Sequence, residues 1–198
     1  MNINELNAHI IEWAKERELD TRGTVEAQAI KTVEELSELI KAICKDKKED
    51  IIDSIGDVYV TLVIGNMLDE NYDLREIQEY IDVLFDDKAI KKCKNINKNY
   101  KLSKSAVFIQ VILDYNYTYM TMQEIICLLT KIAYSYDLDF VECVESAYNT
   151  IKNRHGVMID GVYVKDEDLA STAAQKATRE FNNDNFKNFA NCFTNDSH

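Results

Sequence analysis

The sequence predicts an all-α protein with one short β-hairpin towards its C-terminus. The 198 residues include no proline and only 5 glycines, so few positions would interrupt a helix. Apolar residues recur at helical spacing along most of the chain, as at Leu6, Ile10 and Ala14. Residues 157–164 instead alternate around Asp160-Gly161, a dipeptide typical of a two-residue hairpin turn.

The first helix is expected over residues 3–18. Asn2 and Glu5 have the spacing of a capping box at its start. Residues 19–24 are expected to form a loop, and Thr24 is the expected N-cap of the next helix.

The central stretch, residues 28–57, contains two helical patterns joined by a charged turn at residues 46–49. Each pattern has an apolar face beside a polar stripe, so we expect the two helices to pack antiparallel as an αα-hairpin. The second of these helices should end near residues 66–71.

Further helices are predicted over residues 74–85, 103–113, 121–136 and 139–154. Capping-box spacing marks the starts of the last two, at Thr121 with Glu124 and at Asp139 with Glu142. The segment over residues 103–113 is rich in β-branched residues, but a buried helix suits this helical chain better than a strand. Six lysines between residues 88 and 101 favour a solvated surface over a lid that reaches a bound anion.

Composition indicates a globular protein of the reducing cytoplasm. Hydrophobic residues make up 46% of the chain and charged residues 29%, and the formal net charge is −12. That charge argues against nucleic acid or an anionic membrane as a partner. The five cysteines show no CxxC spacing, and neither a secretory signal nor an eighteen-residue apolar span is evident. We therefore expect a cytoplasmic location.

Acidic residues dominate the polar stripes of the two central helices. At about 100° per residue, Gln28, Lys31, Glu35 and Glu38 fall within one narrow arc of the first helix. The second helix carries a similar arc, formed by Asp50, Asp53, Ser54 and Asp57. An antiparallel hairpin would bring these carboxylates face to face, and Mg²⁺, which prefers carboxylate oxygens, is the expected counterion.

These motifs resemble the MazG-type all-α nucleoside triphosphate pyrophosphohydrolases, which include the dimeric dUTPases and a dCTPase. That family shows EExxE followed by ExxD, and here Glu34-Glu35-x-x-Glu38 precedes Asp53-Ser54-Ile55-Gly56-Asp57. Ser54 stands where the family has its second-helix glutamate, and Asp53 is the candidate replacement. A second match, over residues 147–165, resembles the G-x-m-x-x-G-x-[FY]-x-K tail of phage MazG-like proteins.

The resemblance implies Mg²⁺-dependent hydrolysis of a nucleoside triphosphate to the monophosphate and pyrophosphate, with Mn²⁺ as an alternative ion. The expected metal ligands are Glu35, Glu38, Asp53 and Asp57. The expected catalytic residues are Glu34, Glu38 and Lys31, with one of the two glutamates as general base. The expected substrate-binding residues are Gln28, Lys31, Asn149, Lys152, Arg154 and Trp13. A homodimer or homotetramer is also implied.

Each of these residues also has a structural explanation. Acid pairs at helical spacing are common on solvated faces, and a lysine or arginine near a helix C-terminus stabilises the helix dipole. Trp13, the only tryptophan, is more readily a core anchor than a stacking surface. The alternative function is therefore a non-catalytic helical interaction or regulatory protein on the same scaffold.

The expected fold is a MazG-like helical bundle with an inserted helical segment and the hairpin. Residues 1–168 would form one domain, with the insertion at about 70–136. Residues 169–198 would add a weak helix, at 169–181, and a polar tail.

Overall fold

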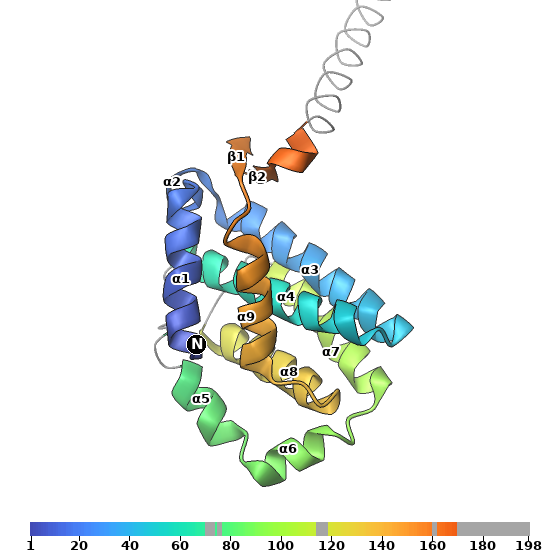
Figure 1. The fold of residues 1–198 in the computed structure, drawn as a ribbon. Coiled ribbons are helices and arrows are strands. Elements are labelled where there is room, and N and C mark those ends of the chain that lie inside the picture. The colour runs from blue at the N-terminus through green and yellow to red at the C-terminus, as the bar shows by residue number, and fades with distance from the viewer. Residues whose placement is uncertain (70–73, 75–76, 114–118, 160–161, 170–198) are drawn as a thin grey trace, which may run out of the picture.

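The computed structural model describes residues 1–69, 74, 77–113, 119–159 and 162–169. Within them the chain forms nine α-helices and one two-stranded antiparallel sheet (Figure 1). The predicted all-α fold with a C-terminal hairpin is confirmed.

The N-terminal helix, α1 (Ile3–Glu16), starts as the sequence predicts. The Asn2 side chain accepts from the Glu5 backbone N–H, and the Glu5 carboxylate accepts from the Asn2 N–H, which completes the capping box. Residues 19–24 were expected to be a loop, which is wrong: a one-turn helix, α2 (Leu19–Arg22), forms there. Its Leu19 side chain is buried, and this burial provides a packing reason for the extra turn.

Two long helices, α3 (Val25–Lys45) and α4 (Lys48–Asp69), form the predicted αα-hairpin. Thr24 caps α3 by accepting from the Ala27 N–H, as expected. The turn is shorter than predicted because α4 already begins at Lys48. Asp46 allows this tight turn by adopting a left-handed conformation with φ 54°.

α4 lies in the middle of the fold, packed against α1, α3, α8 and α9 (Figure 1). Its most apolar 18-residue window has a mean hydropathy of 1.4, which by length and composition alone would suffice to cross a membrane. However, 72% of that window is buried inside the protein. A central position in the core therefore accounts for the apolar composition of this helix.

The segment after α4 forms α5 (Ile77–Leu84), α6 (Asp87–Cys93) and α7 (Lys98–Leu113). The lysine run is divided between α6, the connection and α7, and part of it is used within the fold: Lys94 pairs with Asp137. Lys101 is 5% exposed and its ammonium lies 3.7 Å from the centre of the Tyr136 ring. α7 is helical as predicted but not fully buried, since Val107 is 55% exposed.

The last two helices are α8 (Tyr119–Ser135) and α9 (Phe140–Ile151). Asp139 caps α9 by accepting from the Glu142 N–H, as predicted. Thr121 was expected to cap α8, which is wrong, because the helix begins two residues earlier. α9 ends at Ile151 and not near residue 154, so the following basic residues lie beyond its last turn.

The hairpin pairs β1 (Gly156–Ile159) with β2 (Val162–Lys165), followed by a short 3₁₀ turn, Asp166–Asp168. In its register Gly156 lies opposite Lys165, and Met158 lies opposite Tyr163. The predicted turn at 160–161 and the predicted helix at 169–181 fall outside the described residues, apart from Leu169.

Gly56 sets the distance between α4 and α9. A Cβ at this position would lie 2.5 Å from both the Ala147 Cβ and the Cys143 carbonyl oxygen. Neither neighbour can swing away, since one is backbone and the other a short side chain. The two helices can therefore approach this closely only with glycine at position 56.

Gly56→Ala should lower the free energy of unfolding by about 2 kcal/mol, because overpacking outweighs the helix propensity gained. Urea denaturation followed by circular dichroism measures the change. Ser37→Ala, on the exposed side of α3, is the control and should have little effect. A Gly56→Ala protein as stable as the wild type would contradict this account of the α4–α9 contact.

Candidate functional site

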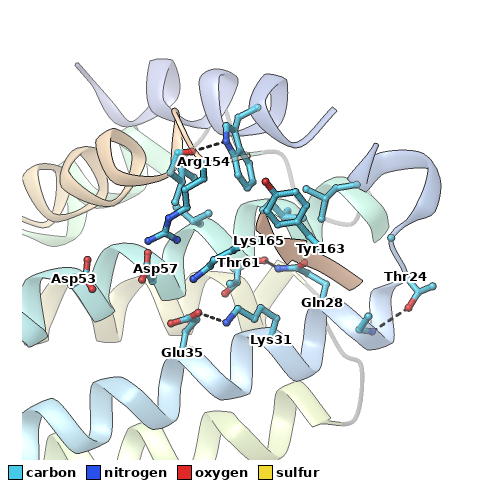
Figure 2. A pocket seen from close by; sticks show the side chains of 17 residues that line it. Thr24, Gln28, Lys31, Glu35, Asp53, Asp57, Thr61, Arg154, Tyr163 and Lys165 are labelled. Carbon is cyan, nitrogen blue, oxygen red and sulfur yellow. Dashed lines mark hydrogen bonds and ion pairs between the residues drawn. The ribbon is translucent and has the colours of Figure 1, made fainter. Parts of the chain in front are cut away.

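A pocket of about 260 Å³ lies between the N-terminal helices, the α3–α4 pair, the end of α9 and the hairpin (Figure 2). Its apolar lining consists of Trp13, Leu19, Gly23, Ala27, Val60, Ile64 and Ile151. Its polar lining consists of Thr24, Gln28, Lys31, Glu35, Asp53, Asp57, Thr61, Arg154, Tyr163 and Lys165. Charged groups and aromatic rings therefore share one cavity.

Glu35 of α3 and Asp57 of α4 lie on the facing sides of the helical hairpin. Glu35 is 7% exposed, and Asp57 is partly buried, while Asp53 lies exposed at the rim one turn away. Three of the four predicted metal ligands therefore line the same pocket.

Burial and the neighbouring carboxylates make Asp57 harder to ionise. Its burial, followed by the negative charges of Glu35 and Asp53, raises its pKa to about 7, although Arg154 and Lys31 act in the opposite direction. A carboxylate whose neighbours oppose its ionisation would gain from a bound cation.

Lys31 already provides part of that positive charge. Its ammonium lies 2.8 Å from a carboxylate oxygen of Glu35 and 2.8 Å from one of Glu34. Burial alone would lower the pKa of Lys31, but the hydrogen bonds and charges of the two glutamates raise it overall. Lys31 therefore stays protonated at the edge of the acidic group.

Arg154 reaches the pocket because α1 holds the end of α9. The last carbonyl groups of a helix lack partners within the helix, and here α1 side chains take up carbonyls at and after the end of α9. The indole N–H of Trp13 donates to the Ile151 carbonyl at 2.9 Å. Arg17 donates to the Arg154 carbonyl from two nitrogens, at 3.1 and 2.8 Å. The backbone at Arg154 is thereby fixed, and its side chain points towards Asp57 (Figure 2).

The opposite end of the pocket is aromatic and apolar. Trp13 and Tyr163 meet edge to face, with ring centres 5.6 Å apart. Trp13 is 8% exposed and lines the pocket, so it is both a core anchor and part of the cavity wall. Between the two ends, Gln28 donates to the Thr61 carbonyl at 3.1 Å, which fixes the orientation of its side-chain amide.

Four predicted site residues lie outside the pocket lining. Glu34 and Glu38 are exposed on α3. Asn149 and Lys152 are exposed near the end of α9 and bond to each other at 2.8 Å. The structure does not place these four with the converging groups, and their roles stay predictions.

Ser54, the position that departs from the family pattern, is 6% exposed and does not line the pocket. Asp53, its predicted replacement, does line it. None of the lysines in the run from residue 88 to residue 101 belongs to the lining, so the structure does not support a lid formed by them.

Sequence reasoning did not assign four polar lining residues, Thr24, Thr61, Tyr163 and Lys165, to the site. A signal for two of them was present, because Tyr163 and Lys165 are two residues apart in an alternating segment and so share one face of β2. The direction in which that face points depends on the packing of the hairpin, which alternation does not reveal.

The donor set suits magnesium better than a metal held entirely by protein. Among the residues that the structure describes, no three His, Cys, Asp or Glu side chains come together as a metal-binding group. Mg²⁺ commonly uses one or two carboxylates and completes its octahedral shell with water and substrate phosphates. Glu35 and Asp57 fit that pattern, and the raised pKa of Asp57 reflects the electrostatic need for a cation.

Comparison with known proteins gives one distant phage relative. Over 63 residues, 32% of this chain, the sequence is 40% identical to an uncharacterized 18.2 kDa protein in the rep-hol intergenic region of Haemophilus phage HP1. The match spans 39% of that protein's length. No family model and no solved structure matches the chain.

In metal-free buffer, Asp57→Asn should stabilise the protein at pH 8 but not at pH 4. The pKa of Asp57 is about 7 in the folded chain, against an ordinary value of 3.8. The native state therefore holds the proton more tightly, and the free energy of unfolding falls as pH rises from about 4 to about 7. The expected gain at pH 8 is on the order of 2 kcal/mol, well below the full linkage value because Asp57 is only partly buried.

Urea unfolding of both proteins at the two pH values, with chelator present, measures this difference. The exposed Asp20 offers a control, since Asp20→Asn should bring no comparable gain at pH 8. Equal stability of wild type and Asp57→Asn at pH 8 would contradict the electrostatic account of the site.

Proposed function

We propose that this protein hydrolyses a nucleoside triphosphate to the monophosphate and pyrophosphate with the help of Mg²⁺. The observation that carries the proposal is the meeting of Glu35 and Asp57 in a pocket that is charged at one end and aromatic at the other. A nucleoside triphosphate needs both environments: charged groups for its phosphates and their metal, and an apolar surface for its base. The sugar separates these two parts of the molecule.

At the charged end, Glu35 and Asp57 would hold Mg²⁺ directly. Asp53 at the rim and Glu38, one turn further along the same stripe of α3, are the other two predicted ligands and would act from the solvent side, where water and phosphate oxygens complete the shell of the ion. The bound ion would neutralise phosphate oxygens and lower the pKa of a coordinated water. Lys31 and Arg154 would place positive charge beside the phosphoryl oxygens, where negative charge increases as the bond to the leaving group breaks.

In the reaction, a water oxygen forms a bond to the α-phosphorus while the bond from that phosphorus to the bridging oxygen breaks. Pyrophosphate leaves with the electron pair of that bond. A carboxylate oxygen of Glu38 or Glu34 would take the proton of the water. Glu34 is paired with Lys31 at 2.8 Å, which makes its carboxylate a weaker base, so Glu38 is the better candidate for this role.

At the apolar end, the rings of Trp13 and Tyr163 offer a surface for the base. Gln28 would present its side-chain oxygen to a hydrogen-bond donor of the base or sugar, because its donation to the Thr61 carbonyl fixes the orientation of the amide. The described pocket therefore supports a nucleotide over an inorganic polyphosphate as the substrate.

A non-catalytic interaction or regulatory protein is the second candidate function. Two observations favour it: Ser54 takes the place of a family glutamate, and Glu35 already has an ion pair with Lys31. On this view the acidic group is neutralised internally and the scaffold serves a partner. The cytoplasmic location and the homodimer or homotetramer stay predictions alongside either function.

Glu35→Gln should reduce pyrophosphate release from the best nucleotide of an NTP and dNTP panel by at least about 100-fold, since a metal ligand is lost. Release is measured with a coupled pyrophosphate assay in Mg²⁺, and EDTA should abolish it in the wild type. Glu12→Gln is the matched control, because Glu12 is an exposed glutamate on α1 that does not line the pocket.

The panel separates the two candidate functions. A wild-type protein that releases no pyrophosphate from any nucleotide, with Mg²⁺ or Mn²⁺, would leave the non-catalytic alternative. A Glu35→Gln protein as active as Glu12→Gln would show that the metal site has been assigned to the wrong residues.

A further inference from the structure

We propose that Lys165, on the hairpin, is the cation that binds the diphosphate end of the ligand in this pocket. The inference rests on the proposed function and names a binding residue that the sequence analysis did not assign. Three observations support it: the direction of β2, the ion pairs that Lys31 already makes, and the absence of a partner for the Lys165 side chain among the described residues.

The direction of β2 follows from contacts on both strands. Tyr163 and Lys165 share one face of the strand, and the Tyr163 ring lies against Trp13 of α1. On β1, the carbonyl of Met158 accepts from Arg22 of α2 at 3.0 Å. A shift of the strand by one residue would turn the side chains of Tyr163 and Lys165 to the opposite face. These contacts therefore orient Lys165 towards the pocket.

Gly156 allows the two strands to lie this close. A Cβ there would lie 2.3 Å from the Val164 carbonyl oxygen and 2.8 Å from the ring of Tyr163. The residue opposite Lys165 in the register is therefore one without a side chain, and the Tyr163 ring can lie across it.

The three cations that line the pocket differ in how they are neutralised. Lys31 has ion pairs with two glutamates at 2.8 Å. The Arg154 side chain makes no ion pair with a described residue and acts on Asp57 only through its charge. The side chain of Lys165 makes neither a hydrogen bond nor an ion pair with any residue in the described part of the chain, and it extends towards the same space (Figure 2).

A partly buried ammonium without a partner in a ligand pocket is suited to bind an anion. The carboxylates Glu35 and Asp57 line the same pocket and would be covered by the metal in the proposed complex. The remaining negative charge would belong to the phosphate chain. A lysine binds such oxygens as a compact point charge, and its contact should be stronger here than in open solvent.

Inorganic pyrophosphate is the probe, because it is the proposed leaving product and carries no base. Binding to the full-length protein in Mg²⁺ is measured by isothermal titration calorimetry. Lys165→Met should weaken it about tenfold, which is the scale of one charge-assisted contact. Lys165→Arg should restore it to within about threefold of the wild type, because the charge is retained.

Lys15 provides the matched control: it is an exposed lysine on α1, outside the pocket lining. Lys15→Met should bind pyrophosphate like the wild type. Because Trp13 is the only tryptophan and contacts Tyr163, pyrophosphate should also change tryptophan fluorescence, at about tenfold higher concentration in Lys165→Met.

The inference is overturned if Lys165→Met binds pyrophosphate as tightly as the wild type, if Lys15→Met weakens binding equally, or if the wild type binds none. These outcomes are separable from failure of the proposed function. Pyrophosphate binding that depends on Lys165, without hydrolysis of any nucleotide, would support the anion site and reject the enzyme. Nucleotide hydrolysis with an unchanged KM in Lys165→Met would support the enzyme and reject the anion site.

Discussion

The close packing of α4 against both α3 and α9 is the constraint on which the pocket depends. Gly56 allows the α9 backbone to approach, and the next residue, Asp57, is then held between Glu35 on one helix and Arg154 beyond the end of the other. Displacement of α9 by the width of a methyl group would move Arg154 and the hairpin away from the carboxylates. Packing in the core thus determines the electrostatics of the cavity.

Burial opposes the charged form of both the acidic and the basic groups in this cavity, so it shifts their pKa values in opposite directions. For Asp57 it adds to the repulsion from neighbouring carboxylates, and the pKa rises to about 7. For Lys31 it works against the charged form but is outweighed by two ion pairs. An acidic group that is only partly neutralised by its own lysine leaves room for a divalent ion, and this imbalance is the physical basis of the proposed magnesium site.

Much of this architecture could be predicted from local signals. The capping box at Asn2 and the side-chain cap at Asp139 act within one helical turn, so sequence spacing is sufficient to find them. The stripe through Gln28, Lys31 and Glu35 was predictable for the same reason. The one-turn helix α2 was missed because burial of Leu19, a tertiary contact, accompanies it.

The composition of the site was less predictable because it depends on how whole elements are oriented. Periodicity places Glu35 and Glu38 on one arc, but packing decides that Glu35 is buried in the pocket while Glu38 is exposed. In the same way, alternation puts Tyr163 and Lys165 on one face of β2, whereas the contact with Trp13 turns that face inward.

The most direct measurement of the central claim is anomalous diffraction from a crystal of the protein soaked in Mn²⁺. The account predicts a manganese peak between the carboxylates of Glu35 and Asp57, inside the pocket that Arg154 and Lys165 also line. It would be contradicted by the absence of a peak there at saturating Mn²⁺, or by a peak only at carboxylates outside this pocket.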